Sequence, residues 1–221
     1  MKRIVETVVA AALAFFMIVS PAHADGDDAA NAASWIAEQG TDDVGVQADQ
    51  VIALASVQDP QYDARIKELV DGLKGSAKSY IKDSPEGAAK LVIVAVATGN
   101  DPSAFGGVNL TSTVIESVRS DGSYGSYPGP FASGLAMVAL ARSDSDVPAS
   151  MTSYLLNEPY LRSDGCFTFA EGEDADPDST SMAILGLEAA KSSDPALAKA
   201  QKCLASLQQS NGSFKAYSPV N

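Results

Sequence analysis

The stretch that decides the fold of this chain occurs three times, as RSDGSY at residues 119–124, RSDGCF at 162–167 and QSNGSF at 209–214. Its glycines, Gly122, Gly165 and Gly212, are 43 and then 47 residues apart. Spacing of this size is typical of repeat proteins, in which each repeat is a small unit that packs on the next one. The sequence therefore predicts a repeat architecture.

Segments of two kinds lie between these turns. The runs LVIVAVA (91–97) and GLAMVALA (134–141) are apolar on all sides, as helices buried in a core are. Segment 62–82 instead places apolar residues at helical spacing with charges opposite, which is typical of a surface helix. The chain is thus predicted to be all-α, with exposed and buried helices alternating in two layers. The predicted outer helices span 29–39, 62–82, 108–119, 147–161 and 195–209, and the inner ones 47–57, 87–98, 131–142 and 179–191.

The repeated turn follows an outer helix in each copy. Its Asp or Asn and its Gly are expected to end that helix with a left-handed residue, because glycine adopts this conformation without strain. The aromatic residue that closes the turn is Tyr124, Phe167 or Phe214. We expect it to fold back and pack between neighbouring repeats.

Residues 1–24 have the features of a secretory signal peptide: a short positive start, an apolar run and a close of small residues. Cleavage between Ala24 and Asp25 would leave 25–221 as one mature repeat domain. A membrane anchor is the alternative, although the apolar run is short for a span. The predicted location is therefore secreted or at the cell surface, with no membrane span in the mature chain.

The charge and the histidine content exclude several classes of function. A net charge of −13 repels nucleic acid and anionic membranes. His23 is the only histidine of the chain and would leave with the signal peptide, which excludes a histidine base and most zinc sites. No cofactor is predicted. For Cys166 and Cys203, export to an oxidising compartment favours a disulfide over two free thiols.

The third turn, with the preceding glutamine, resembles a known motif. QQSNGSF is similar to the Gln-x-x-Asp/Asn-Gly-x-Trp turn of squalene and oxidosqualene cyclases, with Phe214 in place of Trp. The alternating helices resemble the α/α toroid of terpene cyclases, protein prenyltransferase β subunits and transcobalamin-type carriers, over residues 28–221. This resemblance implies a closed ring of six inner and six outer helices. The chain supplies four and five, about four and a half helix pairs, so we expect a fragment of a longer protein, or closure by oligomerisation or a partner.

The acidic segment EGEDADPDST (171–180) is the candidate for chemistry. Its last five residues resemble the Asp-x-Asp-Asp-Thr motif of class II terpene cyclases, in which the middle aspartate protonates an alkene or epoxide. The resemblance places that role on Asp178, with Asp176 beside it, and such an acid must be kept protonated in an apolar cavity. Ser179 departs from the pattern by replacing the last aspartate.

Two other interpretations of this segment remain open. Asp178 or Ser179 could cap the next helix, because a helix N-terminus favours acidic and hydroxyl side chains. Asp174, Asp176 and Asp178 could instead bind Ca²⁺ through hard oxygen ligands at alternate positions. Capping is favoured over acid catalysis, since the predicted inner helices are aliphatic and lack the aromatic lining of a cyclase cavity.

The function expected from these features is a non-catalytic binding or interaction scaffold for a small apolar or cofactor-like ligand or a surface partner. The resemblance to cobalamin carriers places the ligand where inner-helix starts and loops meet. Tyr127 and Phe131 of YGSYPGPF (124–131), together with Asp174, are the candidate contacts. The alternatives are a class II cyclase-like enzyme that uses Asp178 and a cell-surface adhesion or structural module.

Overall fold

The computed structural model of the chain describes residues 26–82, 84–157 and 160–214. Within these ranges the regular elements are helices, accompanied by a few isolated β-bridges, so the predicted all-α class is confirmed. No helix in these ranges is both long enough and apolar enough to cross a membrane. The predicted signal peptide and its cleavage between Ala24 and Asp25 lie outside the described residues.

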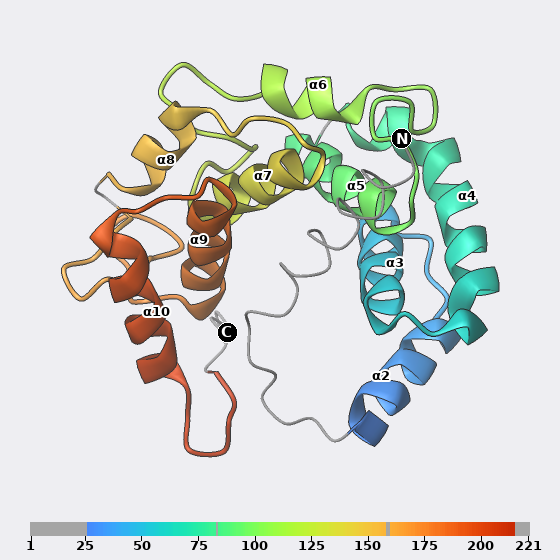
Figure 1. Ribbon diagram of the computed structural model, residues 1–221, viewed down its shortest axis with the longest axis horizontal. Coiled ribbons are helices and arrows are strands. Elements are labelled where there is room, and N and C mark those ends of the chain that lie inside the picture. The colour runs from blue at the N-terminus through green and yellow to red at the C-terminus, as the bar shows by residue number, and fades with distance from the viewer. Residues whose placement is uncertain (1–25, 83, 158–159, 215–221) are drawn as a thin grey trace, which may run out of the picture.

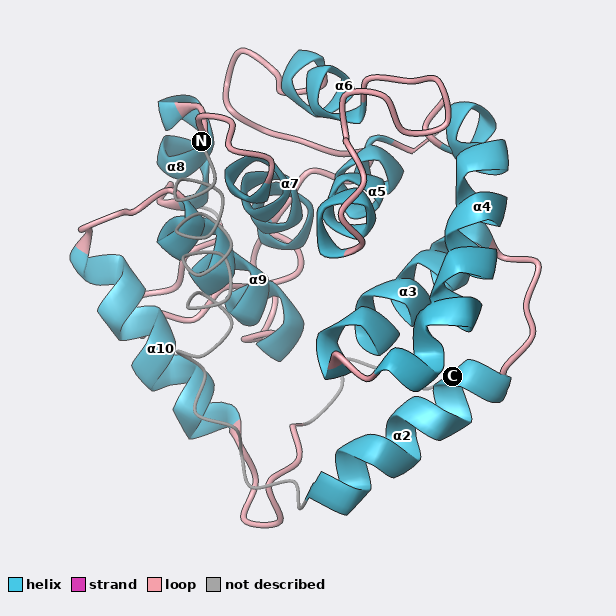
Figure 2. Cartoon of the chain, turned by 45° about the vertical axis from the view of Figure 1, so that its right-hand side comes forward, coloured by secondary structure: helices cyan, strands magenta, loops and turns pink. Residues whose placement is uncertain are grey.

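The helices form two layers of an open arc, with α2 and α10 at its two ends (Figures 1 and 2). The outer helices are α2 (Gly26–Glu38), α4 (Asp63–Tyr80), α6 (Leu110–Glu116), α8 (Ala149–Leu155) and α10 (Pro195–Leu207). The inner helices are α3 (Val44–Val57), α5 (Pro85–Ala97), α7 (Pro130–Arg142) and α9 (Pro177–Ala189). A short 3₁₀ helix, η2 (Pro60–Tyr62), precedes α4. The described residues do not close a ring, and the toroid stays a prediction.

The inner helices begin at residues suited to a helix start. Three of them open with proline, whose fixed φ matches the first helical position and whose missing N–H is not needed there. Asp43, Ser84 and Asp176 cap α3, α5 and α9 by accepting a hydrogen bond from the third backbone N–H that follows. These helices supply much of the buried core, including Leu54, Leu91, Met137, Leu140 and Leu187.

Helices α7 and α9 pack so closely that their contact requires glycine. A Cβ atom on Gly134 would lie 2.0 Å from the carbonyl oxygen of Met182, and one on Gly186 would lie 2.8 Å from the Cα atom of Gly134. Both distances are well inside van der Waals contact. The backbones of the two inner helices therefore touch at Gly134 and Gly186, which fixes the register between α7 and α9.

The outer helices α6 and α8 are shorter than the sequence predicted, which is a correction of the expected ranges 108–119 and 147–161. Helix α6 is rich in Thr, Ser and Val, which are weak helix formers. After α8 the chain instead extends so that Leu161 and Phe167 form an isolated β-bridge. The apolar periodicity continues past both helix ends, and this continuation misled the prediction.

The three repeated turns share one backbone geometry. In each, the N–H of the first residue donates to the carbonyl of the fifth, over 2.9, 2.9 and 2.8 Å, and the glycine N–H donates back to the first carbonyl. The glycines are left-handed, with φ of 88°, 91° and 85°. Side-chain oxygens of Asp121, Asp164 and Asn211 accept the N–H that follows the glycine. This is an Asx turn, which explains why each copy has Asp or Asn before Gly.

The predicted left-handed glycine is thus confirmed, but its predicted role at the helix end is wrong. Helices α6, α8 and α10 end at Glu116, Leu155 and Leu207, several residues before each glycine. A separate turn is needed because the chain must first leave the outer layer before it can reverse toward the inner one. The glycine therefore reverses the connecting segment, and other residues end the helix.

The aromatic residue after each glycine has a different environment in the third copy. Tyr124 and Phe167 are fully buried, as expected for residues packed between repeats. The Tyr124 hydroxyl donates a hydrogen bond to the carbonyl of Pro85 at the start of α5, which links two repeats. Burial, with a further contribution from Glu86, raises the pKa of Tyr124 well above its usual value. Phe214 is instead 41% exposed.

The glycines of the first and third turns allow a matched test. A Cβ atom on Gly122 would lie 2.0 Å from the Ser150 carbonyl oxygen, whereas one on Gly212 would have no atom within 4 Å. We expect Gly212→Ala to cost about 1–2 kcal/mol of unfolding free energy, from the left-handed backbone alone. Gly122→Ala adds the clash and should cost roughly 3 kcal/mol or more. Urea denaturation measures both, and equal losses would contradict the packing role of Gly122.

Candidate functional site

Two loops meet at the N-terminal ends of α7 and α9, and we call this region the rim: residues 124–131 and 167–178. The Tyr160 hydroxyl donates to the Pro128 carbonyl over 3.1 Å, and a Cβ atom on Gly129 would lie 3.5 Å from the Phe169 carbonyl oxygen. The second loop is held by a β-bridge between Thr168 and Ala175. The rim therefore brings together segments about 40 residues apart in the sequence.

The rim exposes three aromatic side chains. Tyr127 and Phe131, both predicted as ligand contacts, are 86% and 45% exposed at the start of α7. Phe169 is 55% exposed on the neighbouring loop, and sequence reasoning did not single it out. The sequence does contain a signal for Phe169, since it is a second aromatic residue placed two positions after Phe167, the aromatic residue of the turn. Large aromatic side chains of a monomeric protein are usually buried, so this exposure marks a candidate contact surface.

The acidic residues of the rim have separate roles. Asp176 is only 5% exposed, and its carboxylate accepts the Ser179 N–H over 2.7 Å, so it caps α9. Capping was expected, although from Asp178 or Ser179. Asp174 and Asp178 are exposed, and neither carboxylate forms an ion pair or a hydrogen bond with another described residue. Asp178 thus lies outside the apolar surroundings that acid catalysis requires, and its catalytic role stays a prediction.

The predicted calcium ligands do not form a tight cluster. Among the described residues, the side chains whose ligand atoms gather within 4.8 Å are those of Asp164, Cys166 and Cys203. The two sulfur atoms are joined in a disulfide, so they offer no thiolate to a metal. With Asp176 engaged in its cap, calcium binding by Asp174 and Asp178 also stays a prediction.

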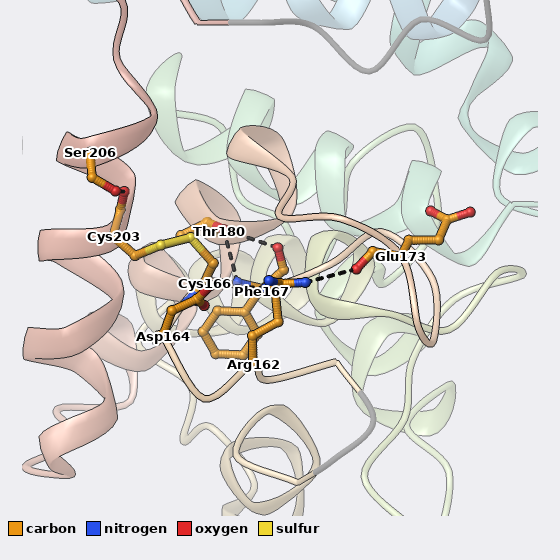
Figure 3. The surroundings of a disulfide bond; sticks show 8 residues. All are labelled: Arg162, Asp164, Cys166, Phe167, Glu173, Thr180, Cys203 and Ser206. Carbon is orange, nitrogen blue, oxygen red and sulfur yellow. Dashed lines mark hydrogen bonds and ion pairs between the residues drawn. A yellow bond between two sulfur atoms is a disulfide. The ribbon is translucent and has the colours of Figure 1, made fainter.

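The predicted disulfide between Cys166 and Cys203 is confirmed, with the two Cα atoms 5.4 Å apart. It joins the second turn to the outer helix α10 (Figure 3). Beside it, Arg162 donates to the Glu173 carbonyl over 3.2 Å and pairs with Asp164 over 3.1 Å. The disulfide and these contacts fix the base of the loop that carries the acidic residues of the rim.

Thr180 fixes the same loop from the opposite side, a role that the sequence did not reveal. Its hydroxyl accepts the Phe167 N–H over 3.0 Å and donates to the Phe167 carbonyl over 3.2 Å, in a fully buried position. The Asp176 N–H also donates to the Phe167 carbonyl. The buried turn is thereby bonded to the first turn of α9, so α9 and the rim form one unit.

Below the rim, α7 and α9 each have one face that is only partly covered. Helix α7 is flanked by α5 and α9 and packed against α6 and α8, so its remaining face lies toward the hollow of the arc (Figure 1). Residues of these faces recur at helical spacing, with Phe131, Asp178 and Leu185 exposed and the others partly buried: Phe131, Leu135, Val138 and Arg142 on α7, and Asp178, Met182, Leu185 and Ala189 on α9. We call Phe131, Leu135, Val138, Met182 and Leu185 the apolar stripe.

The corresponding face of α3 and α5 is polar. Lys90 on α5 pairs with Asp49 on α3 over 2.9 Å, and Glu86 at the start of α5 accepts the Ser126 N–H over 2.6 Å. The concave side is therefore divided, with paired charges on the half formed by α3 and α5. On the other half, an apolar ligand would remove the apolar surface of the stripe from water, which favours binding.

A cavity of about 490 Å³ lies elsewhere, beside α4 and the C-terminal ends of α3 and α5. Leu54, Ile66 and Val70 form part of its lining. Its two lysines are already engaged, since Lys67 pairs with Asp71 over 2.6 Å and Lys74 donates to Asn100 over 2.6 Å, and Asp59 and Asp63 also line it. The lining of this cavity mixes charged, polar and aliphatic side chains and includes no aromatic ring, so we favour the rim and the apolar stripe.

Comparison of the chain with protein-family models, with curated proteins and with solved structures found no match.

The disulfide should contribute strongly to stability. It closes a loop of 37 residues, and the loss of chain entropy in the unfolded state predicts about 3–4 kcal/mol of stabilisation. We expect the Cys166→Ala/Cys203→Ala variant to lose that amount in urea denaturation. A reductant should lower the stability of the unsubstituted protein similarly and leave the double variant unchanged. No effect of the reductant on the unsubstituted protein would contradict this contribution.

The hydrogen bonds of Thr180 can be tested with a matched pair of variants. Thr180→Val keeps the shape of the side chain but leaves the Phe167 N–H without its acceptor, which should cost about 1–3 kcal/mol of unfolding free energy. Thr180→Ser keeps the hydroxyl and should cost clearly less. If urea denaturation gives the same loss for both, the methyl group and not the hydroxyl holds the loop.

Proposed function

We propose that this protein is an exported, non-catalytic scaffold that binds a small apolar ligand along the apolar stripe of α7 and α9. The signal-peptide features of residues 1–24 and the disulfide support export, because disulfides persist in oxidising compartments. The resemblance of the repeated turn to α/α-toroid proteins, some of which carry ligands, supports a scaffold.

The observation that carries the proposal is the shared register of the apolar stripe on two touching helices. Phe131, Leu135 and Val138 on α7 correspond to Asp178, Met182 and Leu185 on α9, each 47 residues later. Adjacent apolar rows on parallel helices form one continuous surface of the kind that apolar ligands bind. Leu185 is 37% exposed at the same turn of α9 as Val138 on α7, so part of this surface is open to solvent.

Binding is favoured over catalysis by what surrounds the acidic residues. A general acid must lie within reach of the reacting atom and be shielded from water. Asp178 is exposed, and Asp176 already accepts the N–H of Ser179. The apolar stripe offers a single aromatic ring, Phe131, whereas stabilising a carbocation by cation–π attraction needs rings around it.

Nile red, a neutral dye that fluoresces in apolar surroundings, tests the proposal. We expect it to bind the oxidised protein with a blue shift of its emission. Leu185→Asp should weaken this binding about tenfold or more, because a buried leucine side chain contributes roughly 1.5–3 kcal/mol. The substitution is placed on a side chain that is already exposed, so the fold should be retained.

The matched control is Ile115→Asp. Ile115 is 44% exposed on the outer helix α6, away from the stripe. It should leave the affinity for Nile red unchanged, and circular dichroism should show both variants folded. Equal weakening by the two substitutions would mean that the dye binds apolar surface in general, which contradicts the proposal.

A further inference from the structure

We infer that the ligand of this site is an amphipathic organic cation, whose ammonium group binds the rim and whose apolar body lies on the apolar stripe. This inference rests on the proposed function and adds the chemical class of the ligand. It depends on three properties of the rim: exposed aromatic rings, carboxylates that pair with no described residue, and the lack of lysine and arginine in its own two segments.

The aromatic rings come first. Tyr127, Phe131 and Phe169 are exposed on two loops that touch at Gly129. The face of an aromatic ring carries partial negative charge and attracts an ammonium group within about 6 Å. Phe131 is also the first residue of the apolar stripe, so a ligand whose cationic end lies at the rim can continue onto Leu135 and Val138 without a polar interruption.

The carboxylates complement the rings. Asp178 occupies the same position on α9 as Phe131 does on α7, the second residue of each helix, and Asp174 lies on the adjoining loop. Both are exposed, and no residue in the described ranges pairs with either of them. An ammonium group at Phe131 would therefore meet negative charge from the neighbouring helix.

Two arginines reach the rim from outside it, and the contacts that they make there are with backbone carbonyls: Arg119 donates to Gly125 over 2.7 Å and Arg162 to Glu173 over 3.2 Å. Residues 120–141 and 163–190 contain neither lysine nor arginine, although they include the whole rim, all of α9 and all of α7 except Arg142. Each helix N-terminus does contribute a partial positive charge, of about half a unit. The negative charges of Asp174, Asp176 and Asp178 together exceed the two partial positive charges of the N-termini of α7 and α9. An anionic head group would be repelled here, and a neutral one would gain no ion pair.

Three probes with the same octyl tail separate the head group from the tail: octyltrimethylammonium, octyl glucoside and octyl sulfate, each below its micelle concentration. Isothermal titration calorimetry on the oxidised protein measures the affinities. We expect octyltrimethylammonium to bind about five- to tenfold more tightly than octyl glucoside, from cation–π and exposed ion-pair contributions together. Octyl sulfate should bind most weakly, and added salt should narrow the differences.

Paired variants locate the preference. Asp174→Asn/Asp178→Asn should reduce the affinity for octyltrimethylammonium to that for octyl glucoside, and Tyr127→Ser should reduce it in part. The control is Asp144→Asn/Asp146→Asn, which removes the same charge from two exposed aspartates just after the C-terminal end of α7. Asp144 has a φ of 54°, which asparagine tolerates well, so this control should remain folded.

The outcomes separate this inference from the proposed function. Equal affinity for all three probes, lost in Leu185→Asp, would support the apolar site and overturn the cation inference. Equal weakening by the control pair would also overturn it, because the preference would then come from the net charge of −13 and not from the rim. If none of the three probes binds, the result contradicts both the cation inference and the proposed function. If the protein prefers the ammonium probe, and the rim variants remove this preference while the control pair does not, the cation inference is established.

Discussion

The reversal of the chain between an outer and an inner helix is the constraint on which the rest of the structure depends. Each reversal is made in six residues, with two backbone hydrogen bonds, a left-handed glycine and an Asx bond from Asp or Asn. These requirements involve only residues of the turn itself, so the same residue types recur in each of the three repeated turns. The turn also delivers its aromatic residue to the inner layer, which is how a local motif comes to organise the packing between repeats.

The first two turns are bound to the next outer helix, and the third is not. Gly122 leaves no room for a side chain beside Ser150 of α8, and Gly165 leaves none beside Lys199 of α10. Around Gly212 the space is open, and Phe214 is half-exposed where its counterparts are buried. Glycine is thus required in the first two turns for both conformation and close approach, and in the third for conformation alone.

Sequence reasoning recovered those features that one residue type or one period determines. The order of the nine helices in the described part of the chain, the left-handed glycines and the disulfide follow from such signals. The ends of α6 and α8 could not be predicted in this way, because the apolar periodicity of the sequence continues beyond the last residue of each helix. The bonds of Thr180 to Phe167 and the exposure of Phe169 depend on which loops meet in space. The pattern of a single sequence does not show which loops meet in space. Tyr127, Phe131 and Asp174 could therefore be predicted as rim residues, whereas the roles of Phe169 and Thr180 could not.

One position in the repeat shows how the same backbone can carry different side chains at the proposed binding site. The second residue of α5, α7 and α9 is Glu86, Phe131 and Asp178. Glu86 is used for structure, since its carboxylate accepts the Ser126 N–H and ties the first rim loop to α5. Phe131 and Asp178 hold the same place without comparable backbone bonds and remain exposed. The turns and the inner helices already fix the backbone, so the Phe131 ring and the Asp178 carboxylate are not needed to hold it. Both groups can therefore contact the proposed ligand.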